Sequence, residues 1–123
     1  CLQGILLPSM KIDTELAWCA GFFDGEGWVG VGKATKRGWY IRVYIGQKYR
    51  EVLDRFQKTV NVGKVNGPHK QGPKFAYAFQ CSNYAGVKQI FTSLAPYLDQ
   101  IKTKQFEQAF NDWENRPVIH RRV

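Results

Sequence analysis

Hydrophobic and polar positions along the chain follow a helical period in some segments and a strand period in others. Asp13 can cap a first helix with an acid in its opening turn, and this helix is expected to run to about Phe23 and to stop in the glycines at 25 and 27. Beyond them the period becomes two, which predicts a strand. A polar turn at residues 35–38 and a second alternating segment that ends near Gln47 complete a hairpin.

A second helix and a second hairpin are predicted next. Helical spacing returns at residues 50–60, and residues 61–63 carry the chemistry of a helix C-cap. The remaining expected elements are strands at 64–68 and 74–81 around a loop with His69, a third helix to about Leu94, and a fourth from about Asp99 to Glu114. The predicted order is therefore helix, hairpin, helix, hairpin, helix, helix.

Two hairpins predict a four-stranded antiparallel sheet in an α+β fold, with helices covering one face. The covered face is expected to hold Val29, Val31, Ile41, Val43, Ile45, Phe75, Tyr77 and Phe79. The open face is expected to hold Trp28, Gly30, Gly32, Ala34, Lys36, Tyr40, Arg42, Tyr44, Lys64, Asn66, Lys74 and Gln80. The open face therefore combines basic side chains, aromatic rings, amides and very small residues, and it has no acidic residue.

Composition narrows the class of partner. The 123 residues are expected to form one domain at 13–114, between an N-terminal arm at 1–12 and a basic tail at 115–123. Eighteen Lys and Arg against ten Asp and Glu give a net charge of +8, which favours a polyanion, with nucleic acid ahead of an anionic membrane surface. No run approaches the roughly 18 apolar residues of a membrane span, so none is predicted.

The small residues of the open face point the same way. Glycine and alanine inside strands lose packing unless something approaches the backbone closely. Together with the missing acids, this favours a concave basic surface laid against a nucleic acid. A plain solvent-exposed face is the alternative.

The cysteines and the start of the chain argue against a zinc site and against secretion. Cys1, Cys19 and Cys81 are widely separated and lie near neither histidine, so zinc-ligand spacing is lacking. Cys19 and Cys81 are expected to be reduced and buried in an intracellular protein. The start has no basic leader and is not expected to be a secretory signal, and Cys1 in place of Met suggests a fragment or a processed start.

Ala17, Gly21 and Gly25 fall at i, i+4 and i+8 of the first helix and form a strip with almost no side chains. Glycine in a helix costs roughly 1 kcal/mol relative to alanine, so the strip needs a reason. Close packing of a second helix supplies one. Alternatively, Gly25 is only a C-cap and Gly21 makes room for a core aromatic.

Two carboxylates, Asp24 and Glu26, stand at the C-terminal end of the same helix. Unpaired carbonyls already make the potential negative there, so the acids make sense mainly if a cation sits among them. Mg²⁺ binds through one or two carboxylates together with phosphate oxygens and water. Cleavage of a phosphodiester with a divalent metal is therefore the predicted chemistry. A two-metal site would need a second copy of the helix end.

The stretch CAGFFDGEG at residues 19–27 resembles the LAGLIDADG motif. Ala20, Gly21, Asp24 and Gly27 match the pattern, and Glu26 occupies the position of the second acid. The chain thus resembles a single-motif LAGLIDADG homing endonuclease, over the element order from about residue 13 to 114. This resemblance implies a saddle-shaped sheet.

The resemblance also implies roles for individual residues. Glu26 stands for the family's catalytic, metal-binding carboxylate, with Gly25 beside it. Gln47 resembles a polar residue that orders water near the metals, and Lys102 resembles a basic residue near the scissile phosphates; an exposed helix lysine is the alternative for Lys102. The implied dimer interface is Ala17, Gly21, Asp24 and Gly25. The implied cofactor is Mg²⁺ or Mn²⁺, with Ca²⁺ supporting binding without cleavage.

The leading hypothesis is a homodimeric, sequence-specific DNA endonuclease of intron or intein mobility, which makes staggered double-strand breaks in a long, near-palindromic site. Expected base readers are Lys36, Arg42, Asn66, Lys74 and Gln80, with Tyr40 and Tyr44. Expected phosphate contacts are Lys33, Arg37, Lys48, Arg50 and Lys70. Trp28, Gly30, Gly32 and Lys64 complete the expected DNA surface. The partner is double-stranded DNA, and no small-molecule substrate is expected.

Two other hypotheses use the same residues differently. A non-cleaving binder on this scaffold would be an intron-splicing maturase that grips RNA or a DNA-binding regulator. The carboxylate at Glu26 argues against it, because pure binding gains little from a cation there. A basic dimerisation module is the third hypothesis, and it predicts nucleic-acid binding without strong salt dependence.

Overall fold

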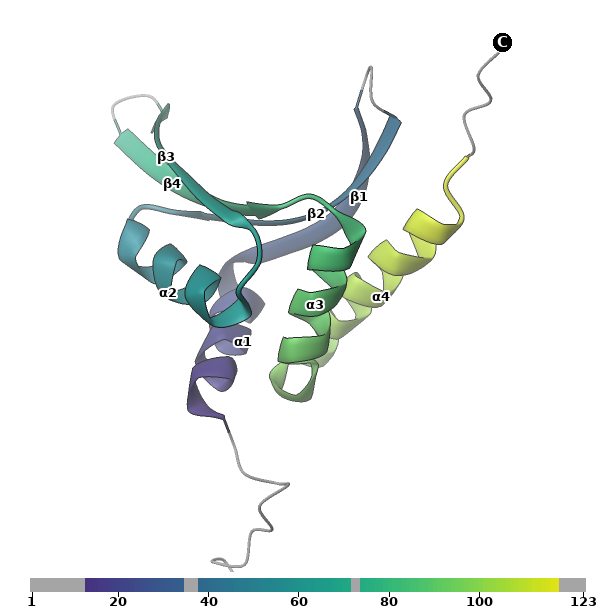
Figure 1. Ribbon diagram of the computed structural model, residues 1–123, viewed down its shortest axis with the longest axis horizontal. Helices are drawn as coiled ribbons and strands as arrows, with labels where there is room; N and C mark the ends of the chain where they lie inside the picture. The colour runs from purple at the N-terminus through teal and green to yellow at the C-terminus, as the bar shows by residue number, and fades with distance from the viewer. Residues whose placement is uncertain (1–12, 35–37, 72–73, 118–123) are drawn as a thin grey trace, which may run out of the picture.

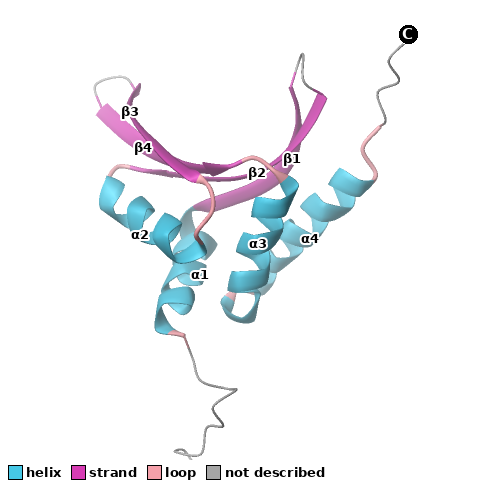
Figure 2. Ribbon diagram, viewed as in Figure 1, coloured by secondary structure: helices cyan, strands magenta, loops and turns pink. Residues whose placement is uncertain are grey.

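The computed structural model describes residues 13–34, 38–71 and 74–117 and has two layers, a four-stranded sheet and a layer of helices (Figures 1 and 2). The elements are α1 (Thr14–Glu26), β1 (Gly27–Ala34), β2 (Gly38–Gln47), α2 (Arg50–Val60), β3 (Lys64–Gln71), β4 (Lys74–Cys81), α3 (Tyr84–Leu94), the 3₁₀ turn η3 (Ala95–Tyr97) and α4 (Gln100–Glu114). The predicted α+β class and element order are confirmed. None of the helices in the described part of the chain is long and apolar enough to cross a membrane.

The sheet has the strand order β1-β2-β4-β3, with every neighbouring pair antiparallel. The two hairpins therefore join through their inner strands, β2 and β4. Figure 2 shows both hairpins curving away from the helices, so the open face of the sheet is concave. The sheet has the predicted saddle shape.

The core lies between the helices and the covered face of the sheet. Ile41, Val43 and Ile45 of β2 are fully buried, and the buried rings of Phe56 and Phe79 meet edge to face with centroids 5.0 Å apart. Burying each such side chain stabilises the fold by about 1.5–3 kcal/mol. Cys19 and Cys81 are free thiols in this core, as predicted.

The second hairpin is longer than its sequence indicates. β3 continues to Gln71 instead of ending at Pro68, so that His69 pairs with Ala76. A register shift between Asn66 and His69 absorbs the Gly67–Pro68 step, because an irregularity of this kind lets a strand pass a proline without losing its partner.

Phe75 lies near the tip of this hairpin and is 57% exposed, although the alternation placed it on the covered face. Phe75 is the second residue of β4, and Figure 1 shows this hairpin curving away from the helix layer toward its tip. Tyr77, two residues further from the tip, is half-buried, and Phe79 is fully buried. Coverage of the sheet therefore increases from the tip toward the centre.

Helix α1 is also longer than predicted. It continues through Gly25 and ends at Glu26, and Gly27 is the C-cap with an extended backbone. A Cβ at Gly27 would collide with the ring of Phe23, which the fold buries completely. The glycine that the helix end requires is thus Gly27, and the interpretation of Gly25 as a C-cap is wrong.

Candidate functional site

The C-terminal end of α1 meets the sheet without a linker. Glu26 is the last helical residue and is exposed, and β1 begins at Gly27. Because Gly27 pairs with Ile45, the end of β2 at Gln47 lies close to the end of α1. Within the described residues the Glu26 carboxylate makes no ion pair within 4.0 Å, so its oxygens are available to an external cation.

Lys102 of α4 is tied to this helix end. Its ammonium donates a hydrogen bond to the carbonyl of Gly27 at 2.7 Å and another to Oε1 of Gln105 at 3.2 Å. It also lies 5.7 Å from the ring centroid of Phe23. The alternative, an exposed helix lysine, is wrong for Lys102 and describes Lys104 instead, which is exposed. A cation therefore faces the negative end of α1, as the helix dipole favours.

Asp24 joins the motif helix to the start of α4 within one chain. Its Oδ1 accepts a hydrogen bond from the backbone N–H of Asp99 at 3.2 Å, and the Asp99 side chain accepts one from the N–H of Lys102 at 2.8 Å. Burial raises the pKa of the Asp24 carboxyl, against the opposing effects of the Asp99 N–H and the Lys102 ammonium. Asp24 thus helps to set the position of Lys102, a link that sequence spacing does not reveal.

The glycine strip of α1 lies open. Gly21 and Gly25 are exposed, and a Cβ built on either would meet nothing within 4 Å. Gly21 therefore does not make room for a core aromatic, and that alternative is wrong. The bare surface can accept a second helix at close range, so the dimer interface stays a prediction that the geometry permits.

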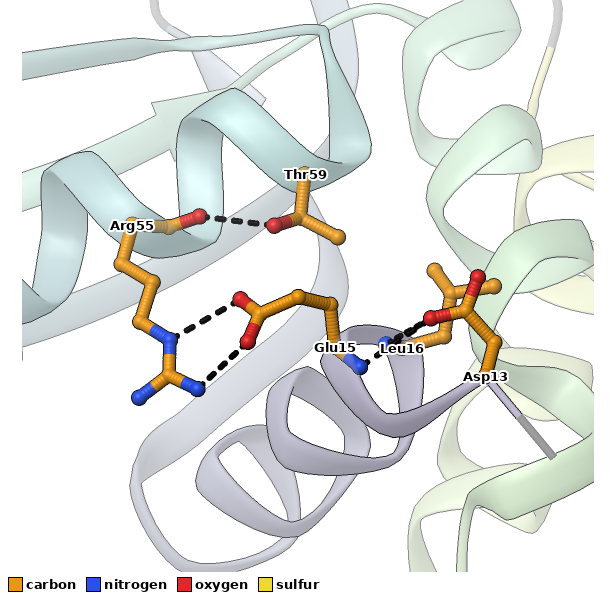
Figure 3. A network of polar contacts seen from close by, with 5 residues as sticks. All are labelled: Asp13, Glu15, Leu16, Arg55 and Thr59. Atoms are coloured by element: carbon orange, nitrogen blue, oxygen red, sulfur yellow. Dashed lines mark hydrogen bonds and ion pairs between the residues drawn. The ribbon is translucent and has the colours of Figure 1, made fainter.

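An aromatic and ionic cluster flanks the strip. The rings of Trp18 and Phe22 stack with centroids 5.1 Å apart, and the Arg55 guanidinium lies 3.8 Å from the Trp18 ring. Figure 3 shows the same guanidinium reaching Glu15 through two hydrogen bonds, of 2.6 and 2.9 Å. The hydrogen bonds from Arg55 lower the pKa of Glu15. Sequence reasoning missed this cluster, because Arg55 and Trp18 belong to different helices.

Charge is segregated between the two layers. All ten carboxylates of the chain belong to helices or to their N-cap positions, and the four strands contain none. The strands carry five lysine and arginine residues: Lys33, Arg42, Lys64, Lys70 and Lys74. The sheet therefore presents a positive potential that no acid of the same layer offsets.

Aromatic side chains of the same sheet lie over the glycines of β1. A Cβ at Gly30 would lie 2.6 Å from the Trp28 ring, and a Cβ at Gly32 would collide with the Tyr40 phenol. The groups that approach these glycines are the chain's own aromatic side chains. Close approach of a nucleic acid is not needed to explain them, although Trp28 remains 45% exposed.

The other predicted DNA contacts fall in different places. Tyr44, Lys64, Asn66 and Lys74 are exposed along the sheet, and Gln80 pairs with both Tyr44 and Lys64. By strand alternation Lys33 leaves the sheet on the helix side, 5.9 Å from the Trp39 ring. Lys48, Arg50 and Lys70 are exposed. Lys36 and Arg37 lie outside the described residues, as does the side chain of Ala34.

No family model matches the chain. It is similar to the intron-encoded DNA endonuclease ai2b of Dictyostelium discoideum, with 23% identity over 94 residues that cover 76% of this chain. It is also similar to the crystal structure of the homing endonuclease I-CvuI in complex with a DNA target, with a TM-score of 0.66 and 21% identity, over 83% of this chain and 69% of that one. The chain has the LAGLIDADG homing endonuclease fold.

The resemblance inferred from CAGFFDGEG is confirmed. The LAGLIDADG meganuclease I-AabMI bound to uncleaved DNA is another similar structure, with a TM-score of 0.65 and 21% identity, over 84% of this chain and 36% of that one. The I-CvuI structure described above holds the I-CreI target in the presence of 2 mM Mg with the DNA not cleaved, and another I-CvuI structure similar to this chain holds its own target in the presence of 2 mM Ca. The chain spans 36% of the length of the curated relative.

Proposed function

We propose that this chain is a sequence-specific DNA endonuclease that acts as a homodimer, uses a divalent metal ion and makes staggered double-strand breaks in a long, near-palindromic site. One observation carries the proposal. The available carboxylate of Glu26 stands where α1 meets a concave sheet without carboxylates, and the ammonium of Lys102 is hydrogen-bonded to the carbonyl of the next residue, Gly27. A carboxylate that can bind a metal ion therefore lies next to a surface that can bind a polyanion.

Double-stranded DNA is the proposed substrate because of the shape and charge of the open face. Side chains of Arg, Lys, Asn and Gln on a concave sheet can enter a major groove and contact the edges of the DNA bases. Lysine and arginine side chains around this face can contact phosphates. The described structures similar to this chain are protein–DNA complexes, which supports the same assignment. Binding is therefore expected to weaken steeply with salt.

The residues present fit a two-metal site only when two copies of the chain share it. The described residues contain no group of three or more His, Cys, Asp or Glu side chains that could hold a metal ion. Each chain offers the Glu26 carboxylate and the nearby carbonyl of Gly25, and Mg²⁺ accepts few protein ligands when phosphate and water supply the rest. A bound metal would activate water and stabilise charge on the leaving oxygen. The I-CvuI structures with Mg or Ca support divalent metals as a class.

Two further side chains have proposed roles near the phosphates. Lys102 would stabilise negative charge on the scissile phosphate with a proton of its ammonium that Gly27 and Gln105 do not engage. Gln47 would position the attacking water from the end of β2. Its Oε1 accepts the backbone N–H of Lys48 at 2.8 Å, which leaves its amide N–H groups to donate.

The proposed dimer packs the strip of Ala17, Gly21 and Gly25 against the same strip of a second copy. A two-fold axis through the strip would bring the two Glu26 residues together, each at the edge of its own sheet. Both strands of a duplex would then be cut, at positions related by the same symmetry.

Selection of cleaved sites tests the proposal. The purified protein is incubated with a randomised duplex library in Mg²⁺, and the new ends are sequenced. The expected result is a near-palindromic consensus with a fixed stagger between the two cuts. Binding of DNA without new ends would contradict an endonuclease. In that case a preference for structured intron RNA over duplex DNA would favour a maturase, and a preference for duplex DNA would favour a DNA-binding regulator.

A further inference from the structure

Arg42 occupies the middle of the concave face, and its guanidinium is held on two sides. It lies opposite Gly30 in the pairing of β1 with β2. The guanidinium carbon is 4.2 Å from the ring centroid of Tyr40, and Nε donates a hydrogen bond to Oγ of Ser82 at 2.8 Å. A ring thus fixes the plane of the guanidinium, and a hydroxyl fixes its direction within that plane.

Ser82 is itself fixed by its place in the fold. It follows the last residue of β4 and precedes Asn83, the N-cap of α3. Its Oγ also accepts a hydrogen bond from Nε2 of Gln80 at 3.2 Å. The two lone pairs of the hydroxyl are therefore occupied by Arg42 and Gln80, and the hydroxyl cannot turn without losing one of them.

The ring of Tyr40 is supported from β1. Gly32 lies directly opposite Tyr40 in the strand register, and the phenol covers the space that a Cβ at Gly32 would fill. The missing side chain at Gly32 is thus what lets the ring lie flat on the sheet and carry the guanidinium of Arg42. Residues from β1 and β2 and from the end of β4 together hold one side chain.

Among the described residues, no hydrogen bond or ion pair engages the two terminal nitrogens of Arg42. All Asp and Glu side chains lie in the described part of the chain, and none forms an ion pair with Arg42. With Nε engaged by Ser82, the end of the guanidinium presents Nη1 and Nη2 as a parallel pair of donors. Guanine offers the matching acceptors, O6 and N7, in the major groove. A side chain that is already ordered loses less entropy on binding.

We propose that Arg42 reads one guanine in each half-site through Nη1 and Nη2, and that Ser82 is the positioning residue for this contact. The inference rests on the proposed function, since it requires duplex DNA in the concave face. A phosphate contact fits less well, because Arg42 stands on an inner strand of the concave sheet, whereas the proposed phosphate contacts lie around that face.

The test measures base preference at each position. A randomised duplex pool is bound in Ca²⁺, and retained sequences are counted for the wild type and for Arg42→Lys, Ser82→Ala, Ser82→Thr and the control Lys70→Ala. Arg42→Lys keeps the charge but loses the paired donors. We expect Arg42→Lys and Ser82→Ala to reduce the preference for guanine about tenfold at one position per half-site. Ser82→Thr keeps the hydroxyl and should retain the preference for guanine. Lys70→Ala should weaken the binding of all sequences alike.

Several results would overturn the inference. One is a guanine preference that Arg42→Lys leaves unchanged, and another is an equal loss of all sequences in Arg42→Lys or Ser82→Ala. Salt-dependent duplex binding without any base preference would overturn it as well, while leaving DNA binding intact. If the wild type retains no duplex at all, the proposed function itself fails, and the reading of guanine fails with it.

Discussion

The ammonium of Lys102 and the carbonyl of Gly27 are joined by a hydrogen bond of 2.7 Å, which ties α4 to the point where the motif helix becomes the first strand. The two residues are 75 positions apart in the sequence. This bond places a cation at the negative end of a helix and next to an exposed acid, Glu26. The same contact serves the fold and the proposed chemistry. Variants of Lys102 can separate the two roles when stability and cleavage are measured on the same protein.

Replacement of Lys102 is expected to reduce cleavage more than binding. Lys102→Met keeps the apolar stem and removes the charge, so the cleavage rate should fall about 10²–10³-fold. Loss of the bond to Gly27 should lower the free energy of unfolding by about 1 kcal/mol. Single-turnover rates and thermal unfolding measure the two effects. Lys104→Met is the matched control, and an equal loss of rate in that variant would contradict the specific role of Lys102.

Enlarging the strip on α1 should disrupt the dimer and leave the monomer folded. Gly21→Leu adds a side chain into open space within one chain, but into the partner helix of the proposed dimer. The dimer dissociation constant should rise at least roughly tenfold, equivalent to about 1.4 kcal/mol. Sedimentation measures it, with Ala85→Leu at an exposed position of α3 as the control. A wild-type protein that stays monomeric with and without DNA would contradict the shared site.

Asp24 is expected to act through its hydrogen bond more than through its charge. Asp24→Asn keeps an acceptor for the N–H of Asp99, whereas Asp24→Ala removes it and should cost about 1 kcal/mol of unfolding free energy. Because burial raises the pKa of Asp24, its ionised form is disfavoured in the folded state, and folding gains stability as pH falls through that pKa. Thermal unfolding at neutral pH should show Asn no worse than the wild type. A larger loss with Asn than with Ala would contradict this account.

The ion pair of Glu15 and Arg55 predicts the opposite pH dependence. Arg55 lowers the pKa of Glu15 from its ordinary value of 4.5, so the pair stabilises the fold above about pH 4.5 and stops doing so as pH falls through the lowered pKa. Glu15→Gln should therefore lower the melting temperature at pH 7 and have a vanishing effect at the acid end. Glu114→Gln serves as the control. A difference that persists unchanged to pH 2 would count against the pair.

Local patterns were enough to predict most of the fold. Helix α2 begins and ends where its apolar stripe and its C-cap residues indicated, and Asn61 has the left-handed conformation of such a cap. The alternation of β2 placed Ile41, Val43 and Ile45 correctly in the core. In these elements the residue period and the tertiary burial agree, so neighbours in sequence carry the information.

The remaining features depend on contacts between distant segments. Helix α1 continues through Gly25 to Glu26, and the ring of Phe23 leaves no room for a Cβ at Gly27, the residue that caps the helix. The link of Lys102 to the motif and of Ser82 to Arg42 arises from the packing of α4 and from the strand order β1-β2-β4-β3. No local spacing encodes these relationships, so the sequence could suggest the candidates but not their partners.

The most direct test of the central claim compares Glu26→Gln with the wild type on a selected DNA site, with Glu107→Gln, an exposed glutamate of α4, as the control. Glutamine keeps the size of the side chain and removes the anionic ligand that a divalent metal requires. Cleavage in Mg²⁺ and binding in Ca²⁺ are measured on the same duplex. We predict that Glu26→Gln abolishes cleavage while its affinity for the duplex stays within about tenfold of the wild type, and that Glu107→Gln cuts normally. Undiminished cleavage by Glu26→Gln would contradict the account.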